Sequence, residues 1–367
     1  MKIVVTGSQG FIGKNLCIFL REQQHEVLEV HRETDQKDIL SYLSLADFVF
    51  HLAGINRPLN PAEFESGNVD VTRFIVDALI ELNSSAPLVF SSSTQAEDGN
   101  DYGVSKFSAE KIVESYSAAT GSASYIYRLP NVFGKWCKPN YNSFVATFCH
   151  NALNGIDISV HDPSAPVRLV YIDDLCASFL ELLDGKATSG FHTLSGDFKT
   201  TVGEVANVIL SFKSSRSTLI TERVGAELTR ALYSTYLSHM PPDQFNYSVA
   251  SYADERGVFC EMLKTKDSGQ FSFFTAHPGI TRGGHYHHTK NEKFLVVRGE
   301  AIFKFENIST GQRHELMVNG SNPEIVETVP GWTHDITNSG NSELVVMLWA
   351  NEIFDRDKPD TITKELF

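Results

Sequence analysis

The stretch KIVVTGSQGFIG, residues Lys2–Gly13, decides the fold of the first half of the chain. Its first five residues form a short apolar run, which predicts a buried strand. Glycines follow at positions 7, 10 and 13, ahead of a helix-like segment. Glycine there permits a tight turn, close backbone approach to a pyrophosphate and close helix–strand packing, and the helix amino terminus attracts negative charge. A turn without a ligand is the alternative, but the placement between strand and helix favours a dinucleotide-binding turn.

The first half of the chain alternates between strand-like and helix-like segments. The apolar, β-rich runs are Lys2–Thr6, Glu26–Val30, Phe48–Leu52, Leu88–Ser92 and Ser124–Leu129. The helix-like stretches between them include Lys14–Arg21, Val71–Leu82 and Lys106–Ala118. This alternation predicts an α/β domain with a doubly wound, Rossmann-type parallel sheet.

From about residue 270 the pattern becomes all-β. Strand-like runs separated by turn residues occur at Gln270–Thr275, Lys293–Val297, Ala301–Glu306, Glu324–Val329 and Glu343–Trp349. They predict a small antiparallel barrel or sandwich. The boundary is expected near Met240–Phe245, where Pro241 and Pro242 end helical continuation. We therefore predict one domain over residues 1–242 and a second over 245–367.

The length, net charge and cysteine content of the chain limit the classes of function that it can have. The chain has 367 residues, enough for two domains, and a formal net charge of −14, which argues against binding nucleic acid. Five cysteines, an odd number without a CxxC pair, indicate reduced thiols rather than a disulfide framework. The sequence shows neither a signal peptide nor an apolar run of membrane-spanning length. We expect a cytoplasmic protein that does not bind membranes.

The end of the second predicted strand bears on cofactor choice. An NAD enzyme usually places an acidic residue there for the ribose hydroxyls. Here the strand Glu26–Val30 is followed by His31 and Arg32. Because a guanidinium suits a 2′-phosphate, the sequence favours NADP, with Arg32 as the phosphate contact. A merely solvated Arg32 is the alternative.

Tyr102 and Lys106 form a Y-x-x-x-K pair whose spacing puts both side chains on one helix face. A nearby ammonium is expected to lower the pKa of the phenol and make it a usable acid or base. The lysine could also hold the nicotinamide ribose. Ser91–Ser93 ends a predicted strand shortly before this pair, so a serine could hydrogen-bond a reacting carbonyl.

A polar, aromatic and cationic segment follows at Lys135–Asn142, with the sequence KWCKPNYN. It could hold a diphosphate through Lys135 and Lys138 or stack on a uracil. An ordinary surface loop is an equally open interpretation.

The second half contains a spaced set of metal-ligand residues. His285 and His287 are two apart, so both can point to the same side of a strand, and Glu292 starts the next strand. A later segment, Pro330–Asn338, supplies His334. Three imidazoles and one carboxylate suit zinc, iron, nickel or manganese. Satisfied core histidines are the alternative. His288 is expected to be a second-sphere or surface residue, not a ligand.

The amino-terminal motifs resemble the extended short-chain dehydrogenase/reductase family. They are Thr6–Gly13, the HLAG segment His51–Gly54, the serine run, the Tyr102/Lys106 pair and the RLPNVFG segment Arg128–Gly134. The resemblance implies Tyr102 as proton donor, Lys106 as its partner and Ser93 as the group that polarises a substrate carbonyl, with Asn68 structural. It implies substrate contacts at Asn131 and Arg168. The predicted cofactor contacts are Gly7, Gly10, Phe11, Ile12, Gly13, His31, Arg32, Leu52, Ala53 and Lys106.

The second half resembles the two cupin motifs, a jelly-roll β-barrel in which His285, His287, Glu292 and His334 would hold one divalent ion, with zinc favoured. It departs from the second motif where Pro330 and Gly331 are adjacent, which puts that local turn in doubt. A metal can stabilise an enolate beside a ketone, and a reductase consumes a ketone, so a shared keto sugar explains the fusion.

A reductase followed by a cupin resembles the bacterial UDP-2-acetamido-2,6-dideoxy-hexulose reductases of capsule and lipopolysaccharide O-antigen synthesis. The segments closest to that family are Lys135–Ser143 and His287–Val297. The resemblance implies a bifunctional enzyme: the cupin epimerises C3 of UDP-2-acetamido-2,6-dideoxy-β-L-arabino-4-hexulose. The first domain then reduces C4 with NADPH. The product would be UDP-N-acetyl-6-deoxy-L-talosamine, a precursor of UDP-N-acetyl-L-fucosamine.

Two further expectations accompany this interpretation. We expect a homodimer, since β-barrel faces often pair between subunits. The alternative function is an NAD-retaining nucleotide-sugar 4-epimerase or dehydratase with a purely structural or dimerising cupin.

Overall fold

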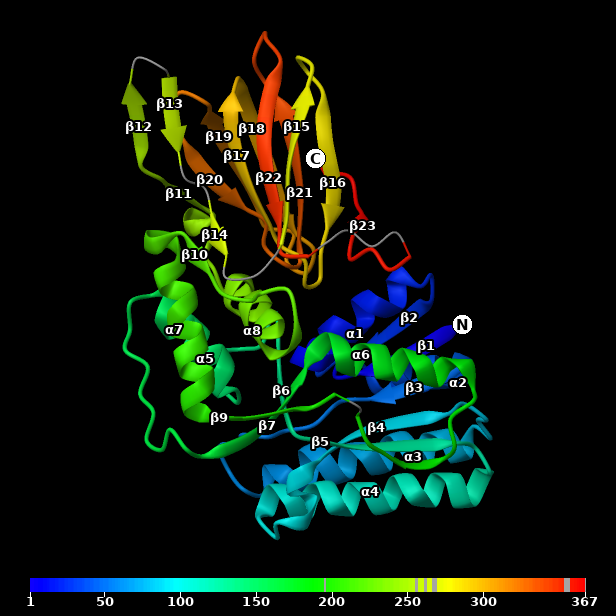
Figure 1. Cartoon of the computed structure of the whole chain (residues 1–367). Helices are drawn as coiled ribbons and strands as arrows, with labels where there is room; N and C mark the ends of the chain where they lie inside the picture. Colours follow the sequence, from blue (N-terminus) through cyan, green and yellow to red (C-terminus); the bar gives the residue numbers. More distant parts are fainter. Residues whose placement is uncertain (195, 255–256, 261–262, 266–268, 353–356, 367) are drawn as a thin grey trace. The chain divides into compact units, whose positions relative to one another are not determined.

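The computed structural model describes residues 1–194, 196–254, 257–260, 263–265, 269–352 and 357–366 of a chain that divides into two compact units (Figure 1). The first unit holds residues 1–133, 141–143 and 167–199, and the second holds 134–140, 144–166 and 200–367. This grouping differs from a single boundary at residues 242–245, because helices before that point pack with the carboxy-terminal strands. The domain ranges 1–242 and 245–367 remain a prediction.

The first unit is built on a six-stranded sheet in the order β2-β1-β3-β4-β5-β8, with every pair parallel. The predicted Rossmann-type sheet is thus confirmed. Its strands are β1 (Lys2–Thr6), β2 (Glu26–Val30), β3 (Phe48–His51), β4 (Leu88–Ser93), β5 (Ser124–Leu129) and β8 (Gly190–His192). A separate three-stranded sheet holds β6 (Asn131–Phe133), β7 (Pro166–Tyr171) and β9 (Phe198–Thr201).

Helices cover both faces of this sheet, which is why its strands read as nearly continuous apolar runs (Figure 1). Val4 and Phe90 point toward one face, where they pack in the cluster formed with α3 and α4. Phe50 and Tyr127 point to the other face and contact Phe179 of α6. The helices are α1 (Phe11–Glu22), α2 (Gln36–Leu45), α3 (Val71–Glu81), α4 (Asp101–Thr120) and α6 (Ile172–Glu181). Short helical turns are η1 (Glu65–Asp70), η2 (Thr94–Glu97) and η3 (Leu182–Asp184).

Helix α4 begins more than one turn earlier than the predicted Lys106–Ala118. Asn100 caps it, since its side chain accepts a hydrogen bond from the Gly103 backbone at 2.8 Å. Gly121 ends it in the left-handed conformation, with φ of 74°. The early start places Tyr102 in the first helical turn, as the Tyr102/Lys106 pair on one helix face predicted.

The second unit contains a group of helices and a set of antiparallel strands. Helix α7 packs on α5 and α8 and starts with a capping box between Thr201 and Glu204. The helices are α5 (Phe144–Leu153), α7 (Val202–Thr218), α8 (Glu227–Ser238) and the short η4 (Pro242–Gln244). Two contacts join them to the strands: Ser234 donates to the Thr289 carbonyl at 2.9 Å, and Arg216 pairs with buried Glu327.

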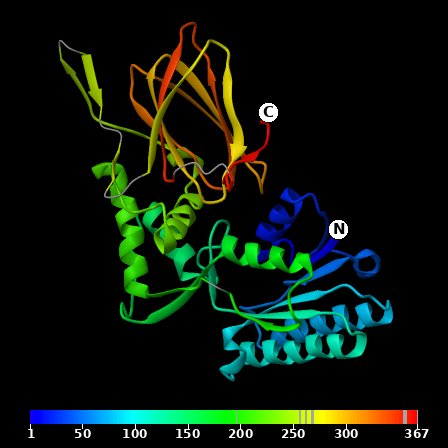
Figure 2. The same cartoon turned by 45° about the vertical axis from the view of Figure 1, so that its right-hand side comes forward.

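Two five-stranded sheets form the β-part of this unit, and their strands enclose a common interior (Figure 2). One has the order β11-β20-β17-β22-β15 and the other β19-β18-β21-β16-β23. The first comprises β11 (Asn246–Ser248), β20 (Glu324–Glu327), β17 (Glu292–Arg298), β22 (Leu344–Ala350) and β15 (Gln270–Ala276). The second comprises β19 (Arg313–Asn319), β18 (Glu300–Asn307), β21 (Trp332–Asn338), β16 (Thr281–Tyr286) and β23 (Ile362–Thr363). Two small ribbons pair β10 (Ile220–Thr221) with β14 (Lys264–Thr265) and β12 (Ser251–Asp254) with β13 (Gly257–Cys260).

These sheets agree with the predicted antiparallel architecture and fit a cupin-type domain. Alternate residues of β18, among them Phe303 and Phe305, are buried against Phe294 and other apolar side chains. None of the helices in the described part of the chain combines the length and apolar character that crossing a membrane requires. Four cysteines are buried free thiols: Cys17, Cys137, Cys149 and Cys176. The side chain of Cys260 lies outside the described residues.

Candidate active site and metal centre

The glycine turn between β1 and α1 has no room for side chains. Gly7 adopts φ of 68°, and a Cβ built on it would lie 2.8 Å from the backbone nitrogen of Ala53. A Cβ on Gly13 would collide with the Gly7 carbonyl oxygen. Helix α1 starts at Phe11 without a capping side chain among the described residues, so its first N–H groups are left for a ligand. A Cβ on Gly10 would lie 3.0 Å from the Gly7 carbonyl oxygen, so close backbone contacts account for the glycines, and the anion site at the turn stays a prediction.

A buried hydrogen-bond chain connects this turn to the rest of the site. The Thr6 hydroxyl accepts from the backbone N–H groups of Leu52 (3.2 Å) and Ala53 (3.1 Å) and therefore donates to His51 Nδ1 at 2.7 Å. The other ring nitrogen of His51 lies 2.9 Å from the Thr72 hydroxyl, which itself donates to the Asn68 carbonyl. This pattern assigns His51 as neutral with its proton on Nε2. Burial agrees with that state, since it lowers the pKa of His51 to about 3.

Asn68 continues the chain and orders the Tyr102 helix. Its side chain accepts from the Ile55 backbone N–H at 2.7 Å and donates to the Ile55 carbonyl and the Ser105 hydroxyl, both at 2.9 Å. Ser105 in turn donates to the Tyr102 carbonyl at 2.7 Å. Asn68 therefore bridges the loop after β3 and the first turn of α4, which agrees with its expected structural role.

Ser93, Tyr102 and Lys106 lie together at the carboxyl end of β4 and the start of α4. Burial raises the pKa of Tyr102, and a hydrogen bond with Ser93 opposes that rise. The predicted lowering of the phenol pKa by Lys106 is therefore wrong for this structure, because desolvation is the dominant effect. Lys106 is itself buried, which lowers its pKa to about 8, and its Nζ lies 4.6 Å from the centre of the Phe90 ring.

A carboxylate that sequence reasoning missed lies one helical turn after Lys106. Glu110 is fully buried and accepts from the Ser92 hydroxyl at 2.5 Å and from Arg128 Nε and Nη2 at 2.9 and 2.8 Å. Its charge raises the pKa of Lys106 and so opposes the effect of burial. The i, i+4 spacing from Lys106 was the one sequence signal that could have identified it.

The residues predicted to choose the cofactor follow β2. His31 is half-buried and its backbone N–H donates to the Thr34 hydroxyl at 3.0 Å, whereas Arg32 is exposed. An exposed guanidinium agrees with either predicted role of Arg32, so the phosphate contact stays a prediction.

The predicted substrate contacts divide between the units. Asn131 and Arg168 belong to the first unit and are exposed, and Arg168 pairs with Asp197 at 2.5 Å. Lys135 and Lys138 belong to the second. Lys138 is exposed, but Lys135 is buried, with its Nζ 5.6 Å from the Trp136 ring centre. The start of this segment is therefore not a plain surface loop.

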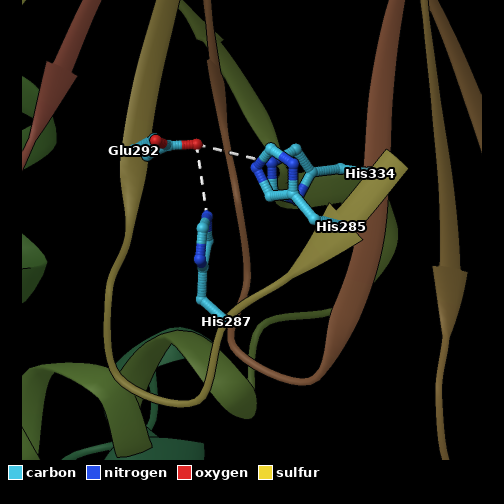
Figure 3. A group of neighbouring side chains, drawn as sticks. All are labelled: His285, His287, Glu292 and His334. Carbon is cyan, nitrogen blue, oxygen red and sulfur yellow. Dashed lines mark hydrogen bonds and ion pairs between the residues drawn. The ribbon is translucent and has the colours of Figure 1, made fainter. Parts of the chain in front are cut away.

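The four predicted metal ligands converge in the second unit (Figure 3). His285 lies on β16, His287 directly after it, Glu292 at the start of β17 and His334 on β21. Their ligand atoms all lie within 4.8 Å of one another. Oε2 of Glu292 is 3.3 Å from Nε2 of His287 and 3.4 Å from Nε2 of His334.

Charge states and hydrogen bonds at this cluster suit a cation. Burial lowers the pKa of His285 to about 3 and also lowers that of His334. Burial raises the pKa of Glu292, but its close contacts with His287 and His334 outweigh burial and hold that pKa well below its usual range. Neutral imidazoles and a carboxylate are the forms that bind metals. Neither ring nitrogen of buried His334 makes a hydrogen bond of standard geometry among the described residues, so the donor set fits a divalent ion.

Neighbouring groups shape this cluster. Gly331 has φ of 78°, so a glycine is required there, and its N–H donates to the His287 carbonyl at 2.9 Å. This contact settles the turn that the adjacent Pro330 and Gly331 had left in doubt. His288 is buried rather than on the surface and stacks edge-on with Tyr286, outside the four-residue cluster.

Comparisons with known proteins agree with both halves. Residues 3–192 match the NAD dependent epimerase/dehydratase family, and residues 252–362 match the polysaccharide biosynthesis C-terminal domain. The chain is 53% identical over 363 residues to the UDP-2-acetamido-2,6-beta-L-arabino-hexul-4-ose reductase of Pseudomonas aeruginosa, covering 98% of each. The chain belongs to the NAD dependent epimerase/dehydratase family. It is a nucleotide-sugar reductase- or epimerase-like enzyme of polysaccharide synthesis, and its family implies a nicotinamide cofactor.

Two solved structures are similar to this chain in fold. The capsular polysaccharide assembling protein CapF from Staphylococcus aureus has a TM-score of 0.69 and 40% sequence identity, with 100% of both chains covered. The UDP-N-acetylglucosamine 4-epimerase from Bacillus cereus has a TM-score of 0.52 and 26% identity, and it covers 57% of this chain and 81% of its own. The fold is thus similar to that of the first protein along the whole chain and to that of the second over 57% of the chain.

Proposed function

We propose that this chain reduces the C4 ketone of a UDP-2-acetamido-2,6-dideoxy-hexulose with NADPH. The observation that carries the proposal is the grouping of Ser93, Tyr102 and Lys106 beside the glycine turn. The near-complete match to a reductase named for such a 4-keto sugar supports the substrate class. Asn131, Arg168, Lys135 and Lys138 are the proposed substrate contacts.

The first-unit residues have states that suit a reduction. When bound, NADPH would supply the hydride. Burial raises the pKa of Tyr102, so the phenol keeps its proton at neutral pH and can donate it to the ketone oxygen as charge develops there. Ser93, which hydrogen-bonds Tyr102, would hold the same oxygen. Lys106 would hold the nicotinamide ribose and add positive charge behind the phenol. Tyr102→Phe should lower kcat by at least a hundredfold with little change in KM.

The preference for NADPH is proposed to rest on Arg32 and His31. Arg32→Ala should reduce the ratio of kcat/KM for NADPH to that for NADH by tenfold or more, while Arg73→Ala, an exposed change on α3, should leave it unchanged. A wild-type enzyme that prefers NADH would contradict the assignment.

The second unit is proposed to epimerise C3 before reduction. His285, His287, Glu292 and His334 would hold one divalent ion, with zinc favoured, and the ion when bound would supply Lewis acidity that favours loss of the C3 proton beside the C4 ketone. The product of both steps would be UDP-N-acetyl-6-deoxy-L-talosamine, on the route to UDP-N-acetyl-L-fucosamine for capsule or lipopolysaccharide. Deuterium incorporation at C3 in heavy water, without NADPH, tests this step, and His285→Ala should abolish it.

A second candidate is an NAD-retaining 4-epimerase or dehydratase with a structural or dimerising barrel. The likeness to a 4-epimerase over the first part of the chain favours it. Such an enzyme regenerates its cofactor, so net oxidation of NADPH separates the two candidates. A homodimer and a cytoplasmic location complete the proposal, and light scattering of the purified protein tests the former.

A further inference from the structure

The carboxy-terminal segment lies against the strand that carries the metal-ligand histidines. Strand β23 pairs with β16, so that Thr363 is opposite His285 and Ile362 is opposite Tyr286. Asp360 comes two residues before β23. The end of the chain therefore reaches the edge of the metal-ligand cluster.

The carboxylate of Asp360 holds the loop that follows His287. Its Oδ1 accepts from the His288 backbone N–H at 2.8 Å. Its Oδ2 accepts from the backbone N–H groups of Thr289 and Lys290, both at 2.6 Å, and from the Thr289 hydroxyl at 3.0 Å. Three successive N–H groups around one carboxylate form an anion-binding nest, here filled by a side chain of the same protein. Charge-assisted bonds of this kind are among the stronger hydrogen bonds of a fold.

The backbone of Asp360 acts on a metal-ligand candidate directly. Its carbonyl oxygen accepts the hydrogen bond from Nδ1 of His287. A carbonyl can only accept, so Nδ1 carries a proton, and Nε2 is the ring nitrogen left to face the cluster and to bind a metal. Nε2 is the atom that lies 3.3 Å from Glu292 in the cluster. Partners of this kind set the tautomer and ring angle of a metal-binding histidine.

The loop so held connects two of the four ligand residues. His287 lies at its start and Glu292 at its end, with His288–Asn291 between them, all buried. Other anchors of the loop come from elsewhere in the second unit. Among them, Ser234 donates to the Thr289 carbonyl, and the Asn291 N–H donates to Asn351 Oδ1 at 3.1 Å. Within the loop, Lys290 pairs with Glu292 at 2.9 Å. Asp360 is the charged anchor that holds three successive N–H groups of the loop. Removing it would release the loop between His287 and Glu292.

We propose that Asp360 is a positioning residue of the metal centre. Its carboxylate fixes the loop after His287, and its carbonyl fixes the His287 ring. The inference rests on the proposed metal site. It makes the segment 357–364 part of that site, although none of its residues is a predicted ligand. Loss of Asp360 should weaken metal binding and change the geometry of the bound ion.

The test compares Asp360→Ala and Asp360→Asn with the matched control Glu365→Gln in the full-length protein. Glu365 is an exposed carboxylate in the same segment. Zinc affinity is measured by competition with a chromophoric chelator, and the visible spectrum of the Co²⁺-loaded protein reports ligand geometry. We expect zinc to bind about 10- to 100-fold more weakly to Asp360→Ala, with an altered Co²⁺ spectrum. Asp360→Asn keeps the side-chain shape but replaces one acceptor oxygen by an amide group. It should weaken zinc binding and alter the Co²⁺ spectrum in the same direction, but less than Asp360→Ala.

The outcomes distinguish failure of the role of Asp360 from failure of the metal site itself. If wild type binds zinc and either folded Asp360 variant binds it equally, with an unchanged Co²⁺ spectrum, the role of Asp360 is refuted and the metal site stands. A wild-type protein that binds neither ion refutes the proposed metal site and this inference with it. Equal weakening in Glu365→Gln would show a general effect of charge and would also overturn the inference.

Discussion

The buried ammonium of Lys106 is predicted to lower the free energy of unfolding of the first unit, although the side chain is needed for function. Burial lowers its pKa from an ordinary 10.5 to about 8. A difference of about 2.5 in pKa corresponds to about 3 kcal/mol between the folded and unfolded forms of the charged side chain. The ring of Phe90, 4.6 Å from Nζ, offsets part of this free-energy cost through a cation–π contact worth about 1 kcal/mol. Lys106→Met, which keeps the length without the charge, should therefore stabilise the first unit by about 2 kcal/mol at pH 7.

The pH dependence identifies the cause. Below pH 8 the lysine is charged in both states, so the full cost is present. Between about pH 8 and 10.5 the unfolded chain binds more protons than the folded one, and wild-type stability rises with pH relative to the variant. The difference between Lys106→Met and wild type should shrink across this range and vanish near its top.

The assay must report on the first unit alone. The tryptophans at positions 136, 332 and 349 all lie in the second unit, so their fluorescence is unsuitable. Hydrogen exchange of β4 and α4 amides at increasing urea measures the free energy of unfolding there. Lys111→Met is the matched control, because Lys111 is on the same helix but more than half exposed, and it should change stability by less than about 0.5 kcal/mol. A variant less stable than wild type at pH 7, or a difference that does not fall above pH 8, would refute the reasoning.

Three other predictions follow from named contacts. Gly13→Ala would press a Cβ against the Gly7 carbonyl, so NADPH binding measured by fluorescence titration should weaken at least tenfold; unchanged affinity would contradict the packing argument for the turn. Glu110→Gln removes the charge that raises the pKa of Lys106, so the pH–rate limb governed by Lys106 should move to lower pH, and an unmoved or raised limb would contradict the assignment. The same variant leaves Arg128 short of an acceptor and should cost roughly 1–3 kcal/mol in unfolding free energy. His285→Ala should lose most bound metal in elemental analysis, and full metal content would exclude His285 as a ligand.

Local patterns in the sequence predicted the features that depend on local geometry. The glycines at 7, 10 and 13 require a tight strand–turn–helix, and the structure has the close contacts that exclude a Cβ. The spacing from His285 to Glu292 puts two ligands at the end of β16 and one at the start of β17, and β21, which pairs with β16, adds His334. The strand patterns were reliable because alternation and apolar runs reflect which faces are buried.

The sequence did not predict features that depend on contacts between distant segments. Asp360 is separated by about 70 residues from the N–H groups it holds, and no pattern in either segment marks the pairing. The contacts of α7 and α8 with the β-part of the second unit have the same origin. The pKa of Tyr102 was mispredicted because desolvation, which only the folded environment determines, outweighs the effect expected from the ammonium of Lys106.

The most direct test of the central claim is the stoichiometry of one reaction. The purified chain is incubated with UDP-2-acetamido-2,6-dideoxy-β-L-arabino-4-hexulose and NADPH, and NADP⁺ formation is compared with product identified by NMR. We expect one NADPH oxidised for each ketone reduced, with UDP-N-acetyl-6-deoxy-L-talosamine as product, and at least a hundredfold slower turnover by Tyr102→Phe. Interconversion of sugars without net oxidation of NADPH would contradict it.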